Sequence, residues 1–291
     1  MALFQKVLFP TDFSEGANAA LSYALRMGAV NGSELIVQHV VGDYFGRHPH
    51  WATLFDVHEL EKKLDFHVEH EMERAVPAEV HDKIRIRRVL SKGRADEAIA
   101  ELAETEMVDV IVMGPARGAV TGKVIRRASR PVLSVPHESQ EATHGEKKGV
   151  ARMLLTTDFS EYSRKVVNYG FELKKRLGCD VELAHIIETP MWFGNMIERP
   201  LHAGVPEKMI EWAENQLKSI TPDEFSTDPT VHRFVGTGAP AASLVARIKA
   251  RNIDLAVLGA HGHGPVQRFL AGTTTEKVLA QGLCPILTVR V

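Results

Sequence analysis

A glycine-rich run in the second half of the chain carries residue types suited to holding a phosphorylated ligand. It reads Gly259-Ala-His-Gly-His-Gly-Pro-Val-Gln-Arg-Phe-Leu-Ala-Gly-Thr-Thr-Thr-Glu276 and follows an apolar segment of strand type. Glycines let backbone amides approach a phosphate closely, and Gly272-Thr273 begins a segment with helical spacing, whose N-terminal dipole favours anions. His261 and His263 add hydrogen-bond donors or positive charge. The run predicts a phosphate-binding loop; its alternative is a plain strand-to-helix connection.

A second polar group, Thr156-Thr157-Asp158, directly follows the first apolar segment of the same half. The carboxylate of Asp158 can accept a hydrogen bond from a base amino group or a sugar hydroxyl. In an open α/β sheet, ligands bind beyond the carboxyl ends of the strands, so we expect both loops at one edge. The alternative for Asp158, and the preferred interpretation of Asp12, is that the side chain only caps a helix.

Metal-binding and nucleophilic motifs are incomplete. His67 and His70 share a helix face, but His-Val-Glu-His is one residue short of a His-x-x-Glu-His motif, so we interpret it as a polar stripe. Cys179 and Cys284 have no histidine or cationic residue nearby in sequence to activate a thiol. No serine lies in a nucleophile elbow. We therefore assign no catalytic residue and no metal ligand.

These segments belong to a sequence unit that occurs twice in the chain. Lys6–Glu15 reappears as Arg152–Glu161, with the shared Thr-Asp-Phe-Ser-Glu runs 146 residues apart, and an offset of 145 maps Gly114 onto Gly259. The period is far longer than that of a solenoid repeat, so each copy should be a domain.

The boundary between the copies is expected near residue 145. The polar stretch 137–148 has no apolar period and is typical of a linker. The resulting domains, 1–145 and 146–291, are each of common domain size.

Each copy alternates strand-like and helix-like segments, which predicts an α/β fold. The fourth strand of each copy is almost entirely apolar, as in a parallel sheet buried on both faces. The sequence therefore predicts two tandem open parallel-sheet domains. The expected strands are Lys6–Phe9, Glu34–Val41, Ile84–Leu90, Val108–Met113 and Val132–Val135, then Met153–Leu155, Asp180–Ile187, Thr230–Val235, Leu255–Leu258 and Ile286–Val289.

The second copy resembles the nucleotide-binding members of the universal stress protein family. Gly259, Gly262, Gly272 and Thr273 stand in the family spacing Gly-x2-Gly-x9-Gly-[Ser/Thr], and the Thr-Asp-Phe-Ser opening also matches. The resemblance covers nearly the whole chain, once per half, so the chain looks like a tandem member. It implies a Rossmann-like fold of the adenine nucleotide alpha hydrolase-like class, ATP as ligand, and Mg²⁺ held on the phosphates of ATP.

Site residues are carried over from the family by position. The resemblance implies that a threonine and an aspartate lie beside the ribose and adenine, and that a backbone edge contacts the base. Glycines and threonines would surround the phosphates. The nucleotide-binding residues implied are Thr156, Thr157, Asp158, Ile186, Gly259, His261, Gly262, His263, Gly272, Thr273 and Thr274.

The first copy departs from this pattern. Gly114 lies 17 positions before Pro131, whereas Gly259 lies 26 positions before Pro285, so the first copy lacks nine residues in the phosphate loop. Asp12 is retained. We predict that the first domain binds no ATP in the family manner. Its basic residues are interpreted as a solvated helix face, with another anion as the alternative.

Composition limits the remaining functions. The formal net charge is -2, which gives no general reason to bind nucleic acid, and no apolar stretch is long enough to span a bilayer. We expect a cytoplasmic stress-response protein that binds an adenine nucleotide and acts as a nucleotide-dependent regulator or scaffold. Its copies are expected to pair within the chain through their last strands; a homodimer and an unknown protein partner are further expectations.

Two other functions remain open. One is an enzyme, either an ATPase or a nucleotidyl transferase, that uses His261 or His263. Since no base is evident to position water, any hydrolysis is expected to be slow. The other is an interaction module without a ligand.

Overall fold

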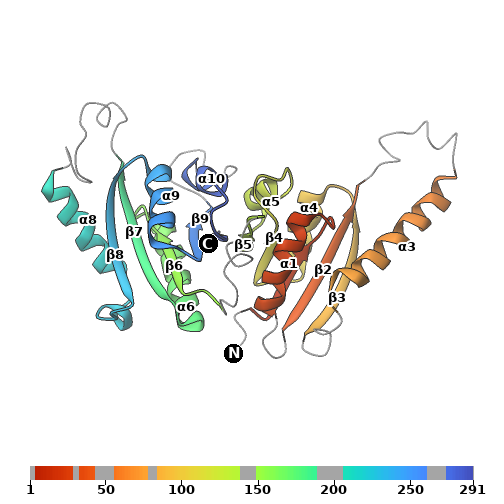
Figure 1. Ribbon diagram of the computed structural model, residues 1–291, viewed down its shortest axis with the longest axis horizontal. Coiled ribbons are helices and arrows are strands. Elements are labelled where there is room, and N and C mark those ends of the chain that lie inside the picture. Colours follow the sequence, from red (N-terminus) through yellow and green to blue (C-terminus); the bar gives the residue numbers. More distant parts are fainter. Residues whose placement is uncertain are drawn as a thin grey trace. The chain divides into compact units, whose positions relative to one another are not determined.

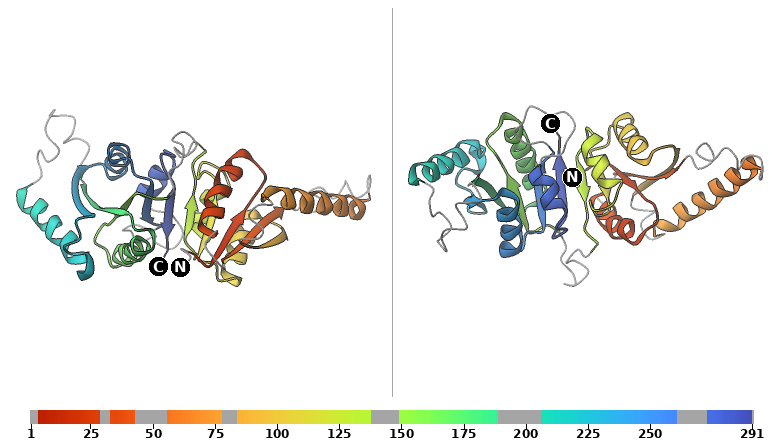
Figure 2. Two further views of the ribbon diagram at one scale, coloured as in Figure 1. Left: turned by 60° about the horizontal axis from the view of Figure 1, so that its bottom comes forward. Right: turned by 90° about the horizontal axis from the view of Figure 1, so that it is seen from above.

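The computed structural model describes residues 4–28, 33–42, 56–77, 84–137, 149–188, 206–260 and 273–290. Its contacts divide the chain into two compact units, Met1–His137 and Glu138–Val291. Each unit is an open sheet with helices on both faces (Figures 1 and 2).

The first unit contains a five-stranded, fully parallel sheet in the order β3-β2-β1-β4-β5. The reversal of strand order at β1 is the point where an open α/β sheet binds its ligand. The strands are β1 (Lys6–Pro10), β2 (Glu34–Val41), β3 (Arg85–Lys92), β4 (Val110–Met113) and β5 (Val132–Ser134); the helices are α1 (Glu15–Gly28), α3 (Val57–Ala75), α4 (Ala95–Thr105) and α5 (Thr121–Arg127).

The second unit repeats this topology in the order β8-β7-β6-β9-β10, again fully parallel. Its strands are β6 (Arg152–Thr156), β7 (Asp180–Glu188), β8 (Val231–Gly238), β9 (Leu255–Gly259) and β10 (Ile286–Val289); the main helices are α6 (Glu161–Leu177), α8 (Glu207–Ile220), α9 (Pro240–Arg251) and α10 (Thr273–Leu279).

The predicted fold class is confirmed, and every expected strand is present. Strand ends differ by one to three residues, and the largest difference is at β8, which ends at Gly238 and not at Val235. At β4 the difference has a local cause: the Val108 N–H donates to the carbonyl of Ala103 at 3.0 Å, so Val108 closes the end of α4 and does not begin the strand. The linker residues around 145 lie outside the described residues, so the domain boundary stays a prediction.

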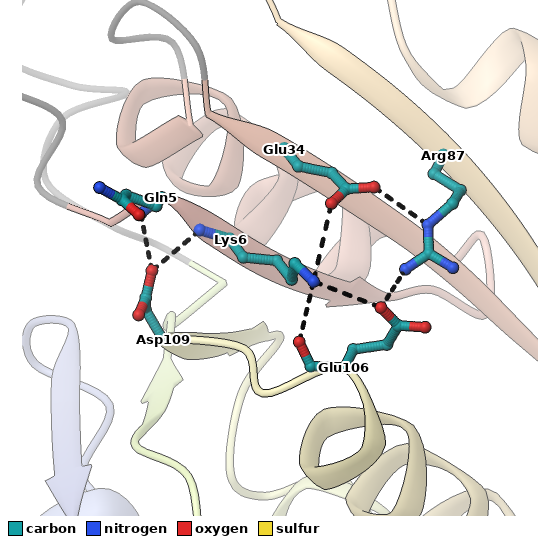
Figure 3. A network of polar contacts seen from close by, with 6 residues as sticks. All are labelled: Gln5, Lys6, Glu34, Arg87, Glu106 and Asp109. Carbon is teal, nitrogen blue, oxygen red and sulfur yellow. Dashed lines mark hydrogen bonds and ion pairs between the residues drawn. The ribbon is translucent and has the colours of Figure 1, made fainter.

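Ion pairs fix the amino end of the first sheet, away from the ligand-binding edge (Figure 3). Glu106, after α4, contacts Arg87 at 2.6 Å and Lys6 at 3.4 Å, while Arg87 also reaches Glu34 at 3.0 Å. Asp109 accepts from the backbone N–H groups of Gln5 and Lys6. These contacts join β1, β2, β3 and the turn before β4. They hold the amino ends of the strands in register with one another.

Candidate functional site

The loop after β6 is held by its own side chains. Asp158 accepts hydrogen bonds from the backbone N–H of Ser160 at 3.0 Å and from the Ser160 hydroxyl at 2.6 Å. Ser160 in turn caps α6 by accepting from the N–H of Ser163. The N-cap of α6 is therefore Ser160 and not Asp158, which instead closes an Asx turn onto Ser160. These bonds hold the Asp158 carboxylate at the carboxyl edge of the sheet.

Phe159 has an unusual backbone conformation in this loop. Its φ of 63° lies in the left-handed region, which is rare for a bulky residue. The conformation brings the Phe159 ring against the His185 ring, with centroids 4.1 Å apart, and edge-on to Trp212 of α8 at 5.3 Å. Phe13 repeats the φ value, at 62°, in the first unit. This recurrence at equivalent positions indicates a feature of the repeat and not a local accident.

His185 ends the backbone pairing between the loop and β7. The Thr157 N–H donates to the carbonyl of Ala184 at 3.0 Å, and the Thr157 carbonyl accepts from Nδ1 of His185 at 2.9 Å. Alternation along a strand turns the N–H and C=O of Ile186 toward the same side as those of Ala184. Among the described residues, no backbone bond from Ile186 to Thr157 follows. The Ile186 backbone therefore presents a donor and an acceptor beyond the end of β6.

Burial lowers the pKa of His185, although the hydrogen bond to the Thr157 carbonyl and the charge of Asp158 both raise it. The ring is therefore neutral at neutral pH. Because its partner is a carbonyl oxygen, Nδ1 carries the proton. His185 acts as a positioning group for the loop.

The end of β9 lies beside this loop because β9 pairs with β6. The hydroxyl of Thr275, in the first turn of α10, donates to the carbonyl of Gly259 at 2.9 Å. This bond ties the start of α10 to the carboxyl end of β9. Six predicted site residues thus gather at one edge: Thr156, Thr157, Asp158, Ile186, Gly259 and Thr274.

The other predicted site residues cannot be placed. His261, Gly262, His263 and Gly272 lie outside the described residues, and of Thr273 only the backbone, at the start of α10, is described. Their assignment to the phosphates stays a prediction.

The first unit repeats the geometry at the end of β1. Nδ1 of His39 donates to the carbonyl of Thr11 at 2.8 Å, and the Phe13 and His39 rings stack at 4.8 Å. A cleft of about 190 Å³ lies at this edge, lined by residues of β1, β2, β4, α1, α4 and the loop before α5. Sequence reasoning missed this cleft, because a volume enclosed by six segments leaves no local pattern.

Metal and thiol chemistry find no support in the described part of the chain. It contains no group of three or more His, Cys, Asp or Glu residues that could hold a metal ion. Burial raises the pKa of Cys179 to about 11 and that of Cys284 to about 12, so both thiols stay protonated at neutral pH. None of the described helices is long and apolar enough to cross a membrane.

Comparisons with known proteins agree with the repeat. The sequence profile described as "Universal stress protein family" matches residues 3–136 and again 149–290. A universal stress protein of Mycolicibacterium smegmatis is 24% identical over 301 residues, which covers 98% of this chain and 96% of that protein.

A solved structure that matches the full length of the chain gives the same result for the fold. A universal stress protein from Archaeoglobus fulgidus DSM 4304 has a TM-score of 0.65 at 18% identity and covers 98% of both chains. A universal stress protein solved in complex with cAMP matches half the chain (49% of it and 98% of that chain) at 18% identity with a TM-score of 0.34. With the family profile matched once in each half, this chain belongs to the universal stress protein family and is a tandem member of it.

Proposed function

We propose that this tandem universal stress protein binds ATP in its C-terminal unit and acts in stress response as a nucleotide-dependent regulator or scaffold. The observation that carries the proposal is the backbone edge of Ile186, which His185 leaves without a partner on β6 by taking the Thr157 carbonyl. The 6-amino group and ring nitrogens of adenine supply the matching donor and acceptor.

Neighbouring groups supply the rest of the proposed site. Asp158, which Ser160 holds in the loop after β6, suits a ribose hydroxyl or a base amino group. Gly259 and the first turn of α10 lie next along the same edge. The glycine spacing from Gly259 to Gly272 favours backbone amides that donate hydrogen bonds to the phosphates. Mg²⁺ would be coordinated by the phosphates of ATP.

In this function the presence of bound ATP, and not its hydrolysis, is the regulatory signal. His185 uses its Nδ1 proton to hold the loop, so it serves as a positioning residue. A slow ATPase and an interaction module without ligand are the competing functions. A cytoplasmic location and pairing of the two units within the chain, or of two chains, remain part of the proposal.

Calorimetric titration with ATP and Mg²⁺ tests the proposal. Gly272→Val should abolish binding, because the side chain fills the space through which the backbone approaches a phosphate. Gly122→Val in the first unit is the matched control: a Cβ there would meet only Ala116 O at 3.6 Å and Arg126 at 3.7 Å, which are ordinary contacts. Loss of binding in the Gly122 variant, or no binding by the natural protein, would refute the proposal.

A further inference from the structure

Four charged side chains at the amino end of the first sheet form a closed network (Figure 3). Lys6 and Arg87 each contact both Glu34 and Glu106, at N–O distances between 2.6 and 3.9 Å. The two positive and two negative charges offset one another. This end of the first sheet therefore offers no excess charge to a ligand.

The second unit repeats one backbone contact of this network. Nζ of Lys6 donates to the carbonyl of Glu106 at 2.9 Å. A guanidinium nitrogen of Arg152 donates to the carbonyl of Arg251, also at 2.9 Å. The shared contact makes Arg251 the counterpart of Glu106. A base therefore stands where the first unit has the acid that closes its network.

His232 takes the place of Arg87. Arg87 lies opposite Ile36, the third residue of β2. His232 lies opposite Glu182, the third residue of β7. Residues in register on neighbouring strands point to the same face of the sheet. The second unit thus has a shorter basic group on β8 and an added carboxylate on β7.

The charge of Glu182 is met from α9. The Glu182 side chain is only 4% exposed, and its Oε1 accepts a hydrogen bond from Nε of Arg247. Its Oε2 accepts from Arg247 at 2.8 Å and from Nε of Arg251 at 3.2 Å. The guanidinium of Arg247 also lies over the Phe234 ring, 3.8 Å from its centroid. Both carboxylate oxygens of Glu182 are therefore occupied, and they hold Arg251 through its Nε atom.

A pocket of about 100 Å³ lies at this end of the second sheet. That volume is about three times the ~30 Å³ that a water molecule occupies in the liquid, and well below the ~300 Å³ of sites for drug-sized ligands. The pocket therefore suits a small ion. Its lining combines charged or titratable residues with apolar ones: Arg152, Asp180, Glu182, His232, Arg251, Met153, Val181 and Ile253.

The charges around the pocket favour an anion. Arg152 and Arg251 are positive, and α9 already neutralises Glu182, so among the described residues that line the pocket Asp180 is the acid left to oppose them. The Arg251 side chain is 41% exposed, which leaves it open to an ion from solvent. His232, exposed on β8, adds an N–H donor. The lining therefore has an excess of positive charge and of donors.

Asp180 determines which anion fits. It is in register with Arg152, and both side chains line the pocket. A carboxylate repels a fully ionised anion but accepts a hydrogen bond from an anion that keeps a proton. Inorganic phosphate keeps a proton at neutral pH, whereas sulfate does not. The pocket should therefore prefer phosphate to sulfate.

We propose that this pocket, at the amino end of the second sheet, is a binding site for inorganic phosphate. Arg152, Arg251 and His232 donate hydrogen bonds to the ion, and Asp180 accepts one from its protonated oxygen. The site is separate from the proposed ATP site, which lies at the carboxyl edge of the same sheet. The first unit has no such site, because Glu106 closes the network there.

Calorimetric titration of the full chain with sodium phosphate and with sodium sulfate, at constant ionic strength, tests the site. The background is Gly272→Val, so that the phosphate loop of the proposed ATP site does not contribute. We expect one phosphate per chain, bound about tenfold more tightly than sulfate, because only phosphate donates to the buried end of the pocket.

Two variants change the site in different ways. Arg251→Glu supplies the acid of the first unit and should weaken phosphate binding by about tenfold or more. Glu182 keeps its bonds to Arg247 in this variant, and urea denaturation checks that the chain still folds. Asp180→Asn removes the charge that repels sulfate, so the two anions should then bind with equal affinity.

Lys249→Glu is the matched control, because Lys249 is exposed on the same helix and does not line the pocket. It makes the same change of charge and should leave phosphate binding unchanged. A loss in Lys249→Glu as large as in Arg251→Glu would overturn the proposal.

Three further results would also overturn it. They are equal affinity for phosphate and sulfate with Asp180 in place, tighter binding of glycerol 3-phosphate than of the free ion, and no saturable phosphate binding up to about 1 mM. ATP is titrated separately into the natural chain, so failure of the ATP proposal leaves these outcomes readable.

Discussion

At the scale of single residues, two histidines decide which backbone groups stay open at the sheet edges. His39 and His185 each take the carbonyl that would continue the strand pairing, which leaves the next residue's backbone open toward the ligand side. The expected strands Glu34–Val41 and Asp180–Ile187 include both histidines, but a strand pattern does not show what their rings bond. The left-handed φ of Phe159 and its contact with Trp212 were missed, because a bulky residue adopts that conformation only when tertiary packing holds it.

The lowered pKa of His185 predicts a pH dependence of stability. Protonation of His185 is less favourable in the folded chain than in the unfolded chain, whose histidine pKa is near the ordinary value. The free energy of unfolding therefore falls as the pH drops below about 6.5. Urea denaturation at pH 7.5 and pH 5.5 measures this fall. His185→Asn keeps a donor near the Nδ1 position and cannot titrate, so it should flatten the dependence. If the His185→Asn variant lost as much unfolding free energy between pH 7.5 and pH 5.5 as the natural protein, His185 would not be the source of the pH dependence.

The buried cysteines predict an unreactive native protein. With pKa values raised to about 11 and about 12, Cys179 and Cys284 carry almost no thiolate at pH 8. Ellman's reagent should modify neither thiol in the folded protein and both in urea. Rapid modification of the folded protein would contradict the burial of these side chains.

At the scale of elements, hydrophobic pattern was enough to find each strand. The interior strands β4 and β9 are continuous apolar runs, and Ile111 and Val257 are fully buried. Strand ends were less accurate, because hydrogen bonds such as that from Val108 to Ala103 decide them and leave no hydrophobic signal. The cleft was invisible for a related reason: it depends on how Gly114 packs against Gly16.

Gly178 is the C-cap of α6 with φ 65°. A Cβ at this position would meet nothing within 4 Å, so substitution is opposed by backbone conformation alone. Gly178→Ala should therefore cost about 1 kcal/mol of unfolding free energy, measured by urea denaturation. Gly149→Ala, at φ 125° and also without neighbours, is a second case of the same strain. Unchanged stability in both variants would contradict the left-handed conformations.

At the scale of the whole molecule, a duplicated unit carries two edges of the same architecture with different loops. The repeat, the fold and the family follow from sequence because the Thr-Asp-Phe-Ser-Glu opening and the glycine spacing are local. We propose that the loop after the fourth strand decides whether a copy binds ATP. The first copy lacks nine residues there, and its loop folds back on Pro115.

Counting bound ATP by equilibrium dialysis of the full chain tests the central claim most directly. We predict one ATP per chain at saturation, lost in Gly272→Val and kept in Gly122→Val. Two ATP molecules per chain, or one that survives Gly272→Val and disappears in Gly122→Val, would contradict it.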